Sequence, residues 1–142
     1  MRVLALDLGT KRVGVALSDR TGTLASPLTT IHRSGDRDAE HRAVALLVAE
    51  EDVERVLVGL PLNMDGSSGP AARAAREEAA ALGALLSVPV ELVDERLTTV
   101  AADRVLMAQG KRAPARRKVV DRTAAALLLQ GWLDGSGKGT VG

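Results

Sequence analysis

Asp7 is the residue of this sequence best placed for chemistry, because residues 3–8 are otherwise all apolar. A carboxylate in such a segment needs a metal ion, a cation or several hydrogen-bond donors to offset its desolvation. A period of two puts Asp7 on one strand face with Val3 and Ala5. Asp7 is therefore a candidate metal ligand. The alternative is a buried aspartate paired with Lys11 or Arg12.

A second pair of acids, Asp94 and Glu95, follows the apolar segment 88–93 directly. Active groups of α/β sheets tend to lie at the carboxyl ends of strands, where this pair is expected. The alternative is an acid near a helix N-terminus, with Thr98 as its N-cap and Arg96 as a surface partner.

Asp121 is the third candidate, near the start of a predicted helix over 119–133. Helical spacing places it on one face with Ala124, Ala125 and Leu128, so this face should pack on the sheet. The alternative is a negative charge stabilised by the positive end of the helix dipole.

Three acids from a strand, a strand end and a helix start suit a hard divalent cation. We predict Asp7, Glu95 and Asp121 as catalytic metal ligands, with Asp94 as a fourth ligand. Mg²⁺ or Mn²⁺ prefers such oxygen ligands, and two ions can activate water and stabilise the leaving oxygen of a phosphodiester. The two histidines lack the spacing of a zinc hydrolase, and the absence of cysteine excludes thiolate sites and disulfides.

Positive charge is concentrated near the end of the chain. Residues 111–142 contain seven Lys and Arg against two Asp, whereas residues 1–110 contain twelve cations against sixteen acids. This asymmetry predicts a basic contact for an anionic partner, although a run such as 111–118 is also typical of a solvated loop. The loop 59–69 could bind a phosphate through its backbone N–H groups, or be a plain connector closed by an Asp-Gly turn. The predicted phosphate contacts are Lys11, Arg12, Asn63, Arg96, Lys111, Arg112, Arg116, Arg117 and Lys118.

Aromatic side chains are almost absent, since Trp132 is the single aromatic residue. Recognition of bases by stacking needs aromatic rings. A nucleic acid would therefore be recognised mainly through its phosphates and its shape, and we expect Trp132 to pack in the core.

The 142 residues suit one domain, predicted over 1–134, with a flexible tail over 135–142. Apolar patterning predicts strands over 2–8, 13–18, 24–31, 55–59 and 88–93, and helices over 37–51, 70–86, 98–109 and 119–133. This order predicts an α/β fold: a mixed five-stranded sheet, an antiparallel meander and then parallel strands, with helices on both faces. No signal peptide or membrane-spanning apolar run is recognised, so we expect a cytoplasmic protein without a membrane partner.

Four segments, 7–16, 59–67, 94–99 and 121–127, together resemble the YqgF/RuvX family, in the family's order. These RNase H-like nucleases are also described as pre-16S ribosomal RNA nucleases and Holliday junction resolvase-like proteins. The resemblance implies an RNase H-like fold and metal-dependent cleavage of RNA or branched DNA. It implies a role in maturing the 5′ end of pre-16S rRNA. The expected partner is this RNA in the ribosomal precursor particle, and we expect a monomer or homodimer. Asp7 matches the first-strand acid, Glu95 (with Asp94 beside it) the strand-end acid, and Asp121 the last-helix acid.

Three other functions remain open. The first is a Holliday junction resolvase acting on branched DNA. The second is a non-catalytic RNA-binding protein of ribosome assembly, which would retain the basic segment but would not need three converging acids. The third is an ATPase, because residues 7–11 also resemble the first phosphate loop of actin-like and sugar-kinase ATPases. Those proteins enclose a nucleotide between two such domains, and 142 residues provide only one.

Overall fold

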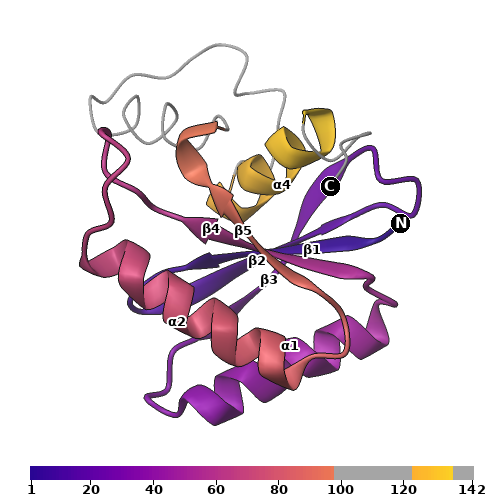
Figure 1. Ribbon diagram of the computed structural model, residues 1–142. Helices are drawn as coiled ribbons and strands as arrows, with labels where there is room; N and C mark the ends of the chain where they lie inside the picture. Colours follow the sequence, from indigo (N-terminus) through magenta and orange to yellow (C-terminus); the bar gives the residue numbers. More distant parts are fainter. Residues whose placement is uncertain (98–122, 136–142) are drawn as a thin grey trace.

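The fold is built on one five-stranded sheet with helices on both faces (Figure 1). The computed structural model describes residues 1–97 and 123–135. The strand order is β3-β2-β1-β4-β5. The elements are β1 (Val3–Leu8), β2 (Arg12–Ser18), β3 (Ala25–His32), α1 (Arg37–Glu50), β4 (Arg55–Leu60), α2 (Pro70–Leu85), β5 (Val90–Asp94), the 3₁₀ turn η1 (Glu95–Leu97) and α4 (Ala124–Asp134).

The sheet is mixed, as predicted. β1, β2 and β3 form an antiparallel meander, whereas β4 pairs in parallel with β1 and β5 pairs in parallel with β4. Tight turns connect the antiparallel strands, while α1 and α2 provide the longer connections that lead into β4 and β5. This is an RNase H-like arrangement, and the α/β prediction is confirmed.

Alternate residues of β1 divide the core into two layers. Leu4 and Leu6 pack with residues of α1 and α2, including Val44 and Leu82. Val3 and Ala5 belong to a second cluster, formed with α4 on the opposite face. Figure 1 shows α1 and α2 together on one side of the sheet and α4 on the other. Because Asp7 continues the alternation of Val3 and Ala5, it lies on the α4 face.

Most of the described elements agree with the sequence predictions to within about two residues, the usual uncertainty of element ends. The start of the last helix differs, because α4 begins at Ala124 rather than at 119. Thr123 is the N-cap, and its side-chain oxygen accepts a hydrogen bond from Ala126 N at 3.1 Å. The predicted helix over 98–109 and most of the predicted tail lie outside the described residues.

The two edges of the sheet are irregular or short. β3 includes Pro27, which pairs with Ala16 where the register shifts after Val15. β5, at the other edge, has five residues, among them Glu91. Within residues 1–97 and 123–135, no helix is long and apolar enough to cross a membrane.

Candidate active site

Asp7 lies near the carboxyl end of β1, between two glycines of the neighbouring strands. It pairs with Gly14 of β2, and Leu6 pairs with Val58 of β4. Continuing the β4 register by one residue places Asp7 beside Gly59. Asp7 is half-buried, and it makes interactions within the protein. The predicted position of this acid, inside a strand and beside a turn, is therefore correct.

Glu95 is the second acid of this site, and its position depends on Gly59. β5 ends at Asp94, and Glu95 begins η1 with only 6% of its surface exposed. A Cβ atom on Gly59 would lie 2.9 Å from Glu95 Oε2 and 3.3 Å from Leu128 Cδ2. The Glu95 carboxylate therefore lies over Gly59, on the strand next to Asp7. Neighbouring strands are about 4.8 Å apart, so both acids border one small region of the α4 face.

The glycines on both sides of Asp7 create the space that this region needs. A Cβ on Gly14 would lie 3.8 Å from Asp7 Cβ and 3.7 Å from Ala125 Cβ, so larger side chains there would meet the acid and α4. Sequence reasoning missed both glycines as site residues. A signal was available, because glycine inside a strand often marks the close approach of another group.

Asp94 has a different environment from Glu95. Arg96 Nη2 donates to Asp94 Oδ2 at 2.8 Å, and Arg96 Nε donates to Asp94 Oδ1 at 3.1 Å. These hydrogen bonds from Arg96 hold the pKa of Asp94 below its usual value. Both carboxylate oxygens of Asp94 thus accept from one guanidinium, so Asp94 and Glu95 do not have equivalent roles.

Arg96 also connects β5 to the loop between β4 and α2. Its Nη1 donates to the carbonyl oxygen of Met64 at 3.1 Å, and its guanidinium lies close to Gly66. Arg96 is exposed, but its guanidinium is held by the Asp94 carboxylate and by the carbonyl oxygen of Met64. Its predicted contact with a substrate phosphate therefore stays a prediction.

The loop over 61–69 has an internal hydrogen-bond network that uses its own amides. Asn63 N donates to Ser67 O at 2.9 Å, and Gly66 N donates to Asn63 O at 2.8 Å. Asn63 Nδ2 donates to Ser67 Oγ at 2.9 Å, and Ser67 Oγ donates to Asp65 Oδ1 at 2.6 Å. These hydrogen bonds shape the loop, so the predicted phosphate contact of Asn63 would have to compete with them.

The remaining predicted residues fall into two groups. Lys11 lies on the turn between β1 and β2, Arg12 begins β2, and both are exposed. Asp121 and the basic segment over 111–118 lie outside the described residues. Within the described residues, no group of three or more His, Asp or Glu is arranged to hold a metal ion. The predicted three-acid site therefore stays a prediction, with two of its acids on one face.

Comparison with known proteins adds the family. The model of the family described as "RuvX: Holliday junction resolvase" matches residues 1–135. The chain belongs to this family. The RuvX match includes all described residues, and so both Asp7 and Glu95.

Relatives of this chain are similar to it over most or all of their length. A protein of Myxococcus xanthus, named "Putative pre-16S rRNA nuclease", is 50% identical over 94% of this chain and 88% of its own length. A protein of Moorella thermoacetica with the same name is 49% identical over 99% of this chain and 100% of its own. Among solved structures, T. thermophilus RuvC in complex with a Holliday junction substrate has a TM-score of 0.59 at 16% identity, covering 97% of this chain and 96% of that one. At that identity the likeness concerns the fold.

Proposed function

We propose that this protein is a divalent-metal-dependent nuclease that acts in the 5′-end maturation of pre-16S rRNA. One observation carries the proposal. Asp7 and Glu95 come from neighbouring parts of the sheet, and both border the space on the α4 face that Gly14 and Gly59 leave open. Membership of the RuvX family and the names of its relatives support nuclease activity on ribosomal RNA precursors. A protein with this role would work in the cytoplasm.

The donor set fits Mg²⁺ or Mn²⁺ because it consists of carboxylates alone, the oxygen ligands that these hard ions prefer. Asp7, Glu95 and Asp121 would hold the metal, which when bound activates water and stabilises the leaving oxygen. Asp94 is less suited as a ligand, since both of its oxygens accept hydrogen bonds from Arg96. We assign Asp94 to positioning Arg96.

The chain's own cations would orient the phosphodiester backbone at these acids. Lys11, on the turn that follows β1, and Arg12, the first residue of β2, are exposed and close in sequence to Asp7. A groove lined by Gly14, Thr30 and Thr123 adjoins the strand pair that holds Asp7, and it would accommodate the substrate. The basic segment over 111–118 would add further phosphate contacts. Binding should therefore weaken steeply as salt concentration rises.

The experiment that tests the proposal compares Asp7→Asn with the unchanged protein. The substrate is an RNA containing the 5′ leader of pre-16S rRNA, in the presence of Mg²⁺ or Mn²⁺. Cleavage should fall at least about a hundred-fold, because metal-ion catalysis contributes several kcal/mol. Asp52→Asn makes the same chemical change at a side chain that is 74% exposed, in the segment before β4, and should leave the rate unchanged. Full activity in Asp7→Asn would refute the assigned site.

Holliday junction resolution is the second candidate, favoured by the description of the matching family. A four-way DNA junction assayed beside the RNA separates the two activities. Cleavage of the junction without cleavage of RNA would select the resolvase. Binding of RNA with no cleavage of either substrate would select a non-catalytic assembly protein.

A further inference from the structure

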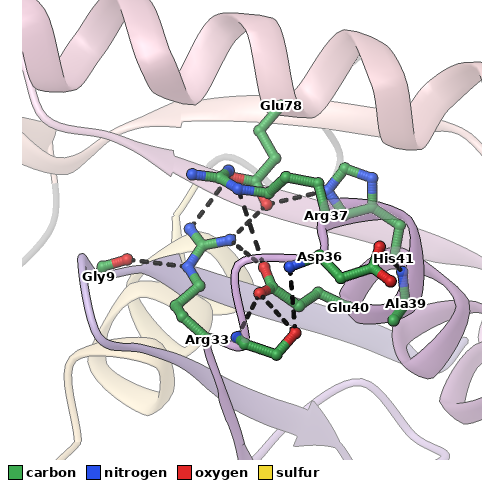
Figure 2. A network of polar contacts seen from close by, with 9 residues as sticks. Gly9, Arg33, Asp36, Arg37, Ala39, Glu40, His41 and Glu78 are labelled. Carbon is green, nitrogen blue, oxygen red and sulfur yellow. Dashed lines mark hydrogen bonds and ion pairs between the residues drawn. The ribbon is translucent and has the colours of Figure 1, made fainter.

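Arg33 holds the turn between β1 and β2, although it lies just beyond the end of β3. Its backbone N donates to Lys11 O at 2.9 Å. Its Nε donates to Gly9 O at 3.1 Å (Figure 2). Inside the turn, Gly9 N donates to Arg12 O at 2.9 Å. The turn is so tight that a Cβ on Gly9 would lie 2.6 Å from the Arg12 carbonyl oxygen. Arg33 thus fixes two carbonyl groups of the segment that presents Lys11 and Arg12.

Two buried carboxylates hold Arg33 in turn. Its Nη1 donates to Glu40 Oε1 at 2.9 Å and to Glu78 Oε2 at 2.7 Å, and its Nη2 donates to Glu78 Oε1 at 3.0 Å. The side chains of Arg33, Glu40 and Glu78 are only 10%, 4% and 6% exposed. His41 Nε2 lies 2.9 Å from Glu78 Oε2, and Arg37 pairs with Glu78 Oε1. Figure 2 shows how these side chains from α1 and α2 surround the Arg33 guanidinium.

The network lies behind the candidate site. Glu40, His41 and Glu78 line a small cavity with Leu6 and other side chains of the α1/α2 face. Asp7 lies on the α4 face, where Glu95 also lies. The turn is therefore anchored from the face opposite the acids, which leaves Lys11 and Arg12 exposed.

We propose that Arg33 is a positioning residue that orients Lys11 and Arg12 toward a phosphodiester backbone lying at Asp7. This inference rests on the proposed nuclease function. A purely stabilising role would not need this geometry, because buried ion pairs often stabilise a fold no more than apolar side chains do. The planar guanidinium reaches Gly9 O and two carboxylates at once through Nε, Nη1 and Nη2. A lysine ammonium is a single point of charge and cannot reproduce these three directions.

Arg33→Lys tests the proposal because it keeps the buried positive charge but removes the planar set of N–H donors at Nε, Nη1 and Nη2. Binding of a single-stranded RNA is measured in EDTA at several salt concentrations. The slope of log affinity against log salt should decrease by about 1.4, since each lost phosphate contact on a single strand accounts for about 0.7. Amide hydrogen exchange at Gly9, whose N–H bonds to Arg12 O, should also become faster. Glu78→Gln is the matched control, because it weakens the network but leaves the Nε contact with Gly9 and the bond to Glu40.

A mutant cycle separates positioning from stability. In a Lys11→Gln/Arg12→Gln background, Arg33→Lys should cause no further loss of RNA affinity, because the cations that it orients are gone. Additive losses, or equal slopes for Arg33→Lys and Glu78→Gln, would overturn the proposal. If Arg33→Lys does not fold, Arg33→Gln/Glu40→Gln removes one charge of each sign and serves in its place. RNA binding without cleavage would refute the nuclease activity, but the effect of Arg33→Lys on RNA binding would still test the role of Arg33.

Discussion

Gly59 determines where the Glu95 carboxylate can lie, because it has no side chain. A methyl group at this position would come within 2.9 Å of Glu95 Oε2, closer than carbon and oxygen normally approach. The end of a flexible glutamate can move away, whereas the strand beneath it cannot. A substitution at Gly59 should therefore displace the acid and leave the sheet intact.

We predict that Gly59→Ala lowers the cleavage rate on the order of a hundred-fold, because misplacing a catalytic group by about 1 Å has an effect of this size. The thermal unfolding midpoint should change by only a few degrees. Gly83→Ala is the matched control, since Gly83 lies on α2 away from the acids and its Cβ would make one ordinary contact, at 3.9 Å from Val90 Cβ. A rate loss in Gly83→Ala as large as in Gly59→Ala would argue against displacement of Glu95 as the cause.

The contact between β5 and the loop over 61–69 depends on Asp94 and Arg96. Asp94 orients the guanidinium, and Arg96 Nη1 then reaches Met64 O at 3.1 Å. If Asp94 positions Arg96 and does not bind metal, its loss should loosen this loop without changing the affinity for the metal.

We therefore predict that Asp94→Asn reduces cleavage about ten-fold, the lower end of the loss caused by removing a supporting residue of a site. The Mn²⁺ concentration for half-maximal activity should stay unchanged, because Asp94 binds Arg96 and not the metal. Glu95→Gln should raise that concentration strongly and reduce the rate much further. Titrations of activity with Mn²⁺ for both variants provide the measurement. A raised requirement for Mn²⁺ in Asp94→Asn would restore Asp94 as a metal ligand.

The elements could be predicted from sequence wherever local patterning alone determines them. β1 and β4 are apolar segments of strand length, and Pro70 begins α2 as its missing N–H favours. The start of α4 could not be placed, because apolar residues at 119 and 120 continue the helical pattern and hide the cap at Thr123. A helix N-cap depends on one side-chain hydrogen bond, and the spacing of apolar residues along the sequence does not reveal that bond.

Part of the candidate site could also be predicted from local sequence patterning. Asp7 was recognisable because a charge interrupts an apolar strand, but the network of Arg33, Glu40 and Glu78 gave no such signal. Charged residues are usually exposed, and Glu40 of α1 and Glu78 of α2 meet Arg33 only when the two helices pack on the same face of the sheet. The role of Gly59 likewise depends on a side chain of another strand end.

For the whole molecule, the buried network makes stability depend on pH. Burial by itself would raise the pKa of Glu78, but hydrogen bonds from Arg33 and His41 outweigh it and hold the pKa at about 2. The hydrogen bond from Arg33 likewise lowers the pKa of Glu40. Both groups have a lower pKa in the folded than in the unfolded chain. Their stabilisation is therefore complete above the ordinary value of 4.5 and is lost as the pH falls toward 2.

We predict that Glu78→Gln makes the free energy of unfolding less dependent on pH between 6 and 2. The unchanged protein should lose roughly 2–3 kcal/mol more than the variant over this interval, the value that corresponds to the shift of Glu78. Urea unfolding at several pH values gives the measurement. Glu77→Gln, the same change on an exposed position of α2, should retain the acid sensitivity of the unchanged protein. Parallel pH curves for Glu78→Gln and the unchanged protein would contradict this account.

The irregular edges of the sheet have a consequence for behaviour at high concentration. An open strand edge is a template on which a second molecule can add its own strand and begin aggregation. Pro27 lacks a backbone donor, and the register shift beside it bends β3 away from a regular ladder. β5 protects the other edge by being short and by containing Glu91. Both edge strands therefore carry features that discourage the pairing of one molecule's sheet with another's.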